Sequence, residues 1–274
     1  MWSFWKTFKF QTWNIRRIAF VSILIATSVS FILIFSSVVP IAALPSFKLT
    51  LGGLPIKLTG YIFGPLIGLV VGLASDLISF MFRPTFIHYW YSLAFAMVGM
   101  VPGIIGYIYN RRWRSKKVVD NLFARKYIVS NYLVTILLLV LILSAITTLI
   151  VWQGDDFFAK QNLIRNKWLF LGIAMFGIMS MLVGMIIFRF VLKPSVFNAV
   201  VPIVAFSAIL EIINTPLLAA GDIAVWGYNS EQFITILTGH LILTPAKIWF
   251  NLFIIYFAYK IISPLIYNKT NNGW

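Results

Sequence analysis

The feature that most constrains this chain is a series of apolar runs long enough to cross a lipid bilayer. The clearest are IAFVSILIATSVSFILIFSSVV, which begins at Ile18, and YIVSNYLVTILLLVLILSAITTLIVW, which begins at Tyr127. A helix needs about 20 apolar residues to cross a hydrocarbon core about 30 Å thick. Apolar residues make up 61% of the sequence and charged residues only 11%. The sequence therefore predicts an all-α polytopic membrane protein, folded as a single membrane domain over residues 1–274.

The apolar runs predict the number and position of the helices. Eight are expected, near 18–39, 52–64, 66–82, 89–109, 127–152, 168–192, 197–218 and 237–261. The second and third could instead form one long helix, because only the pair Gly64-Pro65 separates them. Proline disfavours helical backbone in the residue before it and has no amide hydrogen to donate, which favours a break at this pair.

The distribution of Lys and Arg decides between these two topologies. Segment 110–126 holds seven basic residues: Arg111, Arg112, Arg114, Lys116, Lys117, Arg125 and Lys126. Short loops rich in Lys and Arg remain in the cytoplasm. With the N-terminus inside, a break at Gly64-Pro65 puts this segment in the cytoplasm, whereas one long helix would put it outside. We therefore expect eight spans with both termini cytoplasmic.

Several function classes are excluded by composition and by missing motifs. The 22 Lys and Arg against 7 Asp and Glu could indicate a nucleic-acid binder, but their place in short loops between apolar runs fits the positive-inside rule, so no nucleic acid is expected. With no cysteine and two histidines, a metal site built from the protein is not expected. The sequence has no GxxxxGK[ST], GxSxG or HExxH motif, which argues against ATP binding by a phosphate loop and against catalysis.

Ionisable side chains inside the predicted helices are the first candidates for a site. They are Lys57, Asp76, Glu211, His240 and Lys247. Charges within a bilayer are costly, so they either line a ligand site or pair inside the protein. Glu211 and Lys247 are expected at similar depths. They are predicted either to form a structural ion pair or to leave Lys247 for a carboxylate of the substrate.

Helical spacing places further polar residues beside these charges. On the last predicted helix, one face carries His240, Thr244, Lys247 and Asn251. On the helix before it, one face carries Ser207, Glu211, Asn214 and Thr215. Residues four and seven positions apart lie on the same side of a helix. Two polar stripes are therefore expected to face away from lipid.

Small residues form two more stripes. Gly60, Gly64, Gly68 and Gly72 recur at every fourth position and are followed at the same spacing by Asp76. Such rows let helix backbones approach closely in membranes, so a structural role is expected for Gly64, Pro65, Gly68, Gly72, Asp76 and Glu211. The first helix carries Ala19, Ser22, Ala26 and Ser30 near one face. This second stripe either packs against other helices of the chain or docks a partner protein.

The predicted outward loops, 43–55, 83–91 and 219–233, are rich in aromatic residues. Tyr89, Trp90, Trp226 and Tyr228 stand beside hydrogen-bonding groups there. This arrangement suits a flat heteroaromatic ligand. It is also typical of the ordinary Trp and Tyr belt at a membrane surface.

The stretch FKLTLGGLPIKLTGYIFGPLIGLVVGLASDLISFMF (47–82) resembles the most characteristic region of the energy-coupling-factor (ECF) transporter S components. Those proteins have a loop ending in LP, an apolar helix, and then FGPxxGxxxGxxxD, which corresponds here to Phe63, Gly64, Pro65, Gly68, Gly72 and Asp76. The final Asp resembles the folate and pantothenate groups more than the riboflavin group. Such subunits commonly have six spans, so the resemblance implies that 127–192 is an inserted helix pair.

The resemblance implies a bacterial cell-membrane subunit that captures a vitamin from outside and docks, through its first helix, on a transmembrane coupling protein driven by two ATPases. ATP would be bound by those partners, and this chain would be neither an enzyme nor the carrier of a cofactor. Folate is the expected vitamin, with pantothenate, riboflavin or thiamine as alternatives, and a membrane enzyme or assembly protein is the alternative from another class. The resemblance extends to Lys48, Leu54 and Pro55 as ligand-binding residues. Position and chemistry add Lys57, Tyr89, Trp90, Trp226, Tyr228, His240 and Lys247.

Overall fold

A computed structural model describes residues 15–38, 51–82, 88–113, 122–152, 166–227, 232–241 and 243–267. These residues form nine helices and no strands. The helices are α2 (Ile15–Val38), α4 (Leu54–Phe63), α5 (Pro65–Phe82), α6 (Tyr89–Trp113), α7 (Leu122–Trp152), α9 (Lys167–Val191), α10 (Pro194–Trp226), α11 (Phe233–Leu241) and α12 (Thr244–Tyr267). The all-α prediction is confirmed.

Seven of the described helices are long and apolar enough to cross a membrane, one fewer than the eight expected. The difference is α4, which has 10 residues and is about 15 Å long at 1.5 Å per residue. Its residues 54–62 are all buried, so the other helices shield this short segment from lipid.

The helices at the C-terminal end differ from the predicted ones at two places. Helix α10 runs to Trp226 rather than ending near residue 218, so part of the predicted outward loop is helical. The helix expected over 237–261 is divided between α11, which ends at Leu241, and α12, which begins at Thr244. Pro245 falls in the first turn of α12, where its missing amide hydrogen costs nothing.

The break at Gly64 folds α5 back against α4. Gly64 has a φ of 104°, a conformation that favours glycine. A Cβ added to Gly68 would overlap Gly60 on α4 and the carbonyl of Gly99 on α6. In one continuous helix, residues 60 and 68 would be about 12 Å apart. Three helix backbones therefore meet at these glycines, which explains why side chains are absent there.

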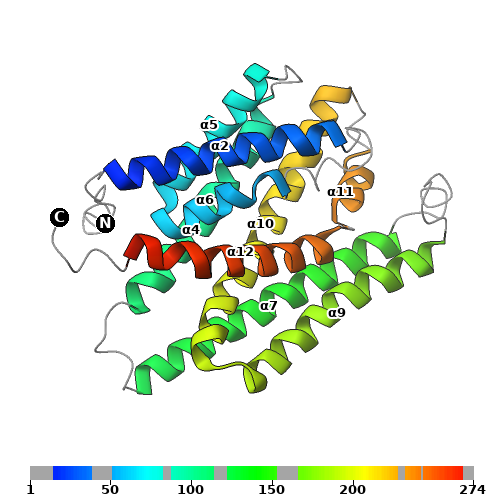
Figure 1. Ribbon diagram of the computed structural model, residues 1–274. Coiled ribbons are helices and arrows are strands. Elements are labelled where there is room, and N and C mark those ends of the chain that lie inside the picture. Colours follow the sequence, from blue (N-terminus) through cyan, green and yellow to red (C-terminus); the bar gives the residue numbers. More distant parts are fainter. Residues whose placement is uncertain are drawn as a thin grey trace, which may run out of the picture.

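Helix α10 runs through the middle of the bundle and contacts α6, α7, α11 and α12 (Figure 1). Helix α2 packs on α4 and α5 at one side, and α7 and α9 lie at the opposite side. Helix α9 also packs against the first turns of α12, where Gly177 meets Pro245 and the Trp249 indole donates to Ser180 Oγ at 3.2 Å. The α7–α9 pair thus covers the side of the bundle formed by α10 and α12.

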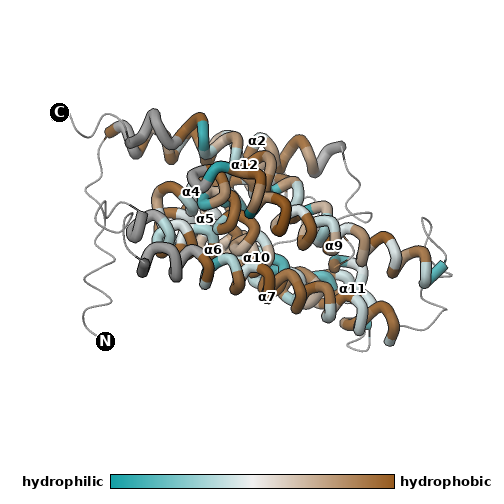
Figure 2. The backbone as a smooth tube through the Cα atoms, turned by 90° about the horizontal axis from the view of Figure 1, so that it is seen from below, coloured by the Kyte–Doolittle hydropathy of each residue, from teal (hydrophilic) through white to brown (hydrophobic). Residues whose placement is uncertain are grey.

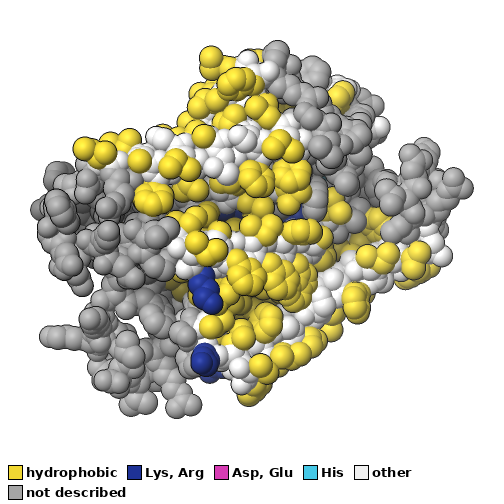
Figure 3. All heavy atoms as spheres, viewed as in Figure 1, with side chains coloured by type: hydrophobic (Ala, Val, Ile, Leu, Met, Phe, Trp, Pro, Cys, Tyr) yellow, Lys and Arg dark blue, Asp and Glu magenta, His cyan; other side chains and the backbone are white. Residues whose placement is uncertain are grey.

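The outer surface of the bundle is apolar. Helices α7 and α9 are hydrophobic along most of their length (Figure 2), and hydrophobic side chains cover most of the described surface seen in Figure 3. Exposed side chains include Phe176 on α9 and Phe253 on α12. This surface matches a hydrocarbon environment, which leaves the interior for polar groups.

Candidate ligand-binding site

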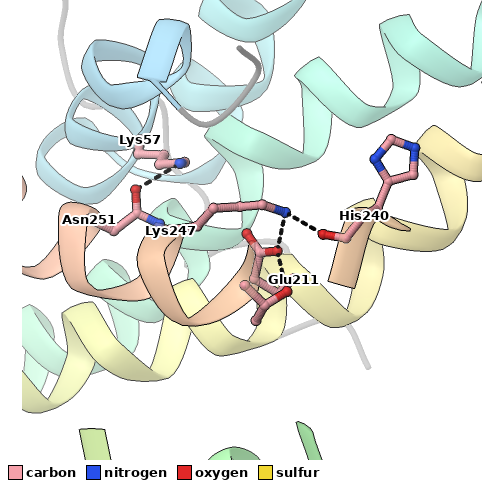
Figure 4. Close-up of polar contacts among 6 residues, drawn as sticks. Lys57, Glu211, His240, Lys247 and Asn251 are labelled. Carbon is pink, nitrogen blue, oxygen red and sulfur yellow. Dashed lines mark hydrogen bonds and ion pairs between the residues drawn. The ribbon is translucent and has the colours of Figure 1, made fainter. Parts of the chain in front are cut away.

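A buried cluster of charged and amide groups lies where α10 meets α12 (Figure 4). The ammonium of Lys247 on α12 is 2.7 Å from Glu211 Oε2 on α10. It also donates to the main-chain carbonyl of His240 at 3.3 Å. The hydroxyl of Thr244 donates to the same Glu211 oxygen at 3.1 Å. Glu211 and Lys247 therefore form an ion pair with two further hydrogen bonds.

Helix α4 contributes a second cation to this cluster. Lys57 Nζ donates to Asn251 Oδ1 on α12 at 2.9 Å, and the Lys57 residue is only 3% exposed. Asn251 lies one turn beyond Lys247 on α12, so the two ammonium groups reach the same region from different helices (Figure 4). Two lysines and one glutamate thus meet inside the helix bundle.

Several buried polar atoms beside these charges have no hydrogen-bond partner among the described residues. They are Ser207 Oγ, Asn214 Oδ1, Thr215 Oγ1 and Asn251 Nδ2. Three of them belong to the same α10 face as Glu211, because they lie four, three and four residues from it. Buried polar groups are normally hydrogen-bonded. This face therefore offers both donors and acceptors to a polar ligand.

A second buried network links α6, α10 and α11. The hydroxyl of Tyr91 donates to Asp222 Oδ1 at 2.5 Å, and His240 Nε2 lies 2.7 Å from Asp222 Oδ2. Next to it, Ser92 donates to Asp76 Oδ2 on α5 at 2.6 Å. Asp76 thus bonds a neighbouring helix.

The structure brings together only some of the predicted ligand-binding residues. Lys57, His240 and Lys247 lie in or beside the buried cluster. Leu54 and Pro55 are buried at the start of α4 rather than in an outward loop. Lys48 and Tyr228 lie outside the described residues.

The predicted aromatic residues lie at helix ends. Tyr89 begins α6, is 65% exposed and packs against the rings of His88 and Trp90. Trp226 is the last residue of α10 and is 46% exposed, so its predicted place in a loop was wrong. None of the hydrogen bonds described for the cluster involves these three aromatic residues. Their positions equally suit a membrane-surface belt.

The small-residue stripe of α2 faces outward. Ala19, Ser22, Ala26 and Ser30 are all exposed. Ser30 donates to the carbonyl of Ala26 at 2.9 Å, so its hydroxyl is satisfied within the helix. The stripe is therefore a smooth surface open to a partner, while the opposite face of α2 packs on α4 and α5.

Asp222 and Tyr91 belong to the buried networks but were not among the predicted site residues. Asp222 lies eleven residues after Glu211, which places both on one side of α10. The signal was present, but Gly221 and Asp222 were interpreted as parts of a loop. Tyr91 gave no signal, because aromatic residues at a helix start are ordinary at a membrane surface.

A family model described as the ECF-type riboflavin transporter, S component, matches residues 12–155, just over half of the chain. Comparison with curated proteins and with solved structures gave no match. The match defines the class of this protein: it is an S component of an ECF transporter, a transport subunit rather than an enzyme. Within that class, the chain belongs to the ECF-type riboflavin transporter S component family.

The family match changes one expectation and leaves another open. It does not support the folate group that the final Asp of the glycine motif suggested. It ends three residues after α7, so it includes Lys57 but not Glu211, His240 or Lys247. The interpretation of 127–192 as an inserted pair stays a prediction.

Proposed function

We propose that this chain captures riboflavin, or a close flavin relative, as the substrate-binding subunit of an ECF vitamin importer. The observation that supports the proposal most is the buried cluster on α4, α10 and α12, within a chain whose family is named for riboflavin. A membrane helix bundle tolerates such a concentration of polar groups where they line a ligand site.

The chemistry of the cluster suits a ligand with a polyhydroxyl chain. Each hydroxyl group both donates and accepts a hydrogen bond. The cluster offers the Asn214 carbonyl oxygen as an acceptor, the Asn251 amide as a donor, and the Ser207 and Thr215 hydroxyls as either. A ribityl chain along this α10 face would satisfy these atoms, and the flat flavin ring would lie among the surrounding apolar side chains.

Folate is the second candidate, because two buried ammonium groups favour a ligand that carries carboxylates. Lys247 pairs with Glu211, and the Lys57 ammonium reaches the same region from α4, where it donates to Asn251. An anionic vitamin would add negative charge there. The family match gives riboflavin the stronger support.

The exposed stripe of α2 is proposed as the docking surface for the transmembrane coupling subunit, whose two ATPases would bind ATP. Small residues let helices of two proteins approach closely in lipid. Because α7 and α9 lie on the other side of the bundle from α2 (Figure 1), docking through α2 would leave them in contact with lipid. We place the protein in the bacterial cell membrane with both termini cytoplasmic, which requires the short helix α4 to complete an eighth crossing beside the seven long helices.

A titration with four vitamins tests the ligand assignment. Detergent-purified protein is mixed with riboflavin, and quenching of the flavin fluorescence is followed. Unlabelled folate, pantothenate and thiamine are then added as competitors. We expect riboflavin to bind with micromolar or tighter affinity and the other three not to displace it. Displacement by folate, together with direct folate binding, would contradict the riboflavin assignment and favour the second candidate.

A further inference from the structure

His240 belongs to both buried networks. Its side chain is 2.7 Å from Asp222, which also accepts a hydrogen bond from Tyr91. Its main-chain carbonyl accepts from the Lys247 ammonium at 3.3 Å. In Figure 4 the imidazole points away from Lys247, whereas the carbonyl faces it. Among the described contacts, Tyr91 and Asp222 have no direct hydrogen bond to the cluster. His240 therefore joins the two networks.

The helix break is what makes the His240 carbonyl available. In a continuous helix this oxygen would accept the amide hydrogen of the residue four positions later, which is Thr244. Thr244 instead begins α12, and carbonyls in the last turn of a helix need other donors. Lys247 is seven residues beyond His240, and its long side chain reaches back to this carbonyl. The ammonium is therefore held by Glu211 on α10 and by the end of α11.

We propose that Asp222 is a positioning residue for Lys247, with Tyr91 as its support. Asp222 fixes the imidazole of His240, which fixes the end of α11 and the direction of the His240 carbonyl. That carbonyl and Glu211 together hold the Lys247 ammonium in one place. This proposal goes beyond the proposed function, because it makes ligand affinity depend on Asp222 and Tyr91, which lie outside the cluster. Testing it by riboflavin affinity rests on the proposed function.

The burial of Asp222 and His240, and the packing of Tyr91, support this chain of contacts. Asp222 and His240 are both buried, at 7% and 4% exposure, so water competes little for their hydrogen bond. Tyr91 packs its ring against Gly221, where a larger residue would displace it. Removing the Asp222 carboxylate would leave His240 without this partner, and Lys247 would keep Glu211 as its main acceptor. The Lys247 ammonium would then occupy several positions. A ligand that binds it in one fixed position would bind more weakly.

A double-mutant cycle tests the proposal, because residues that act through one another give non-additive effects. Riboflavin affinity is measured for Asp222→Asn, Lys247→Gln and the double variant. Glutamine at 247 is one atom shorter than lysine and uncharged, so it removes the ammonium that Glu211 and the His240 carbonyl hold. We expect Asp222→Asn to weaken affinity about tenfold alone and not at all when Lys247 is already Gln. Tyr91→Phe removes one interhelical hydrogen bond and is expected to weaken affinity about threefold.

Ser92→Ala is the matched control. Ser92 is next to Tyr91 on α6 and also donates to a carboxylate on another helix, but that carboxylate is Asp76. We expect its effect on affinity to be small and the same in both Lys247 backgrounds. Equal effects of Asp222→Asn in both backgrounds would overturn the proposal, since Asp222 would then act independently of Lys247.

A ligand-free readout separates this proposal from the proposed function. The same cycle is run on the apparent Tm of the purified protein without vitamin. If the wild type binds no riboflavin, the proposed function fails, but non-additive Tm shifts between residues 222 and 247 would still support the positioning role. Additive shifts would overturn it. If Asp222→Asn does not fold, Tyr91→Phe replaces it in both cycles.

Discussion

The helices of this bundle are held together in different ways in two regions. Where α4, α5 and α6 meet, Gly60, Gly68 and Gly99 bring three backbones into contact. Where α4, α10 and α12 meet, Lys57, Glu211 and Lys247 fill the space with long charged side chains. Lipid provides no hydrophobic driving force between helices, so close packing and polar bonds hold membrane bundles together.

The glycine contact is suited to holding the fold, whereas the charged region has the features of the proposed ligand site. Among the described residues of α4, α5 and α6, Ser75 Oγ on α5 is the buried polar side-chain atom without a hydrogen-bond partner. The charged region has four buried polar atoms without described partners. Close backbone contact needs no ligand, whereas polar groups inside a membrane bundle are costly unless they pair within the protein or bind a ligand. The predictions below test this division, from the largest expected loss of stability to the smallest.

The strongest test of the glycine contact is Gly99→Ala. Its Cβ would overlap the backbone of Gly68, and backbone cannot move aside as a flexible side chain can. We expect a loss of about 3 kcal/mol or more, seen as loss of the monodisperse peak in size-exclusion chromatography. Gly172→Ala on α9 is the control, because no heavy atom lies within 4 Å of its added Cβ. Tolerance of Gly99→Ala would contradict the packing account.

A loss of similar size is expected in the ion pair. Glu211→Gln leaves the buried Lys247 ammonium without its carboxylate, which costs roughly 3–5 kcal/mol. The double variant Glu211→Gln with Lys247→Met removes both charges of the pair, so most of that loss should be recovered. Thermal unfolding of the wild type and the two variants in one detergent measures this. Equal instability of the single and double variants would show that the pair does not stabilise the bundle.

A smaller effect is expected where α5 meets α6 at the other end of the glycine stripe. Ser92→Ala removes the hydrogen bond to Asp76. Interhelical hydrogen bonds in membrane proteins contribute about 0.6 kcal/mol on average. A Tm decrease of about 1–2 °C with unchanged riboflavin affinity is the expected outcome. A large loss of affinity would mean that Asp76 belongs to the ligand region instead.

Substitutions in the proposed docking stripe of α2 should have the smallest effect on stability. Ala26→Phe adds bulk to an exposed position of α2, so the free energy of unfolding of the isolated subunit should change by no more than about 0.5 kcal/mol. Vitamin uptake by cells with the whole transporter should fall severely, because a large side chain separates closely packed helices. Ile173→Phe, on the lipid-exposed face of α9, is the control with normal uptake. Equal uptake by both variants would argue against docking through α2.

Features set by local sequence could be predicted. The break at Gly64 was predicted because proline restricts the residue before it and because the basic segment 110–126 is expected in the cytoplasm. Gly64 has the positive φ that glycine allows. The break between α11 and α12 was missed, although Pro245 was a local signal for it. Proline in the first turn of a helix often marks where that helix begins.

Features set by distant contacts could not be predicted. Lys57 and Asn251 are 194 residues apart in the sequence, and no periodicity relates them. Helix α10 continues through Gly221 and Asp222, where the Tyr91 ring packs on the glycine and its hydroxyl donates to the aspartate. These contacts depend on how α4, α6, α10 and α12 are placed, and single-helix patterns contain no such information.

We propose that the cluster of Lys57, Glu211 and Lys247 binds the vitamin. A riboflavin titration of a variant that lacks the Glu211–Lys247 pair tests this proposal. Riboflavin binding is measured for the double variant Glu211→Gln with Lys247→Met, after unfolding shows that it is folded. We expect the double variant to have a Tm close to that of the wild type. Its riboflavin affinity should be at least about 100-fold weaker, since two polar contacts to the ligand are lost. Wild-type riboflavin affinity in this folded variant would contradict the assignment of the ligand site to the cluster, because the vitamin would then bind elsewhere.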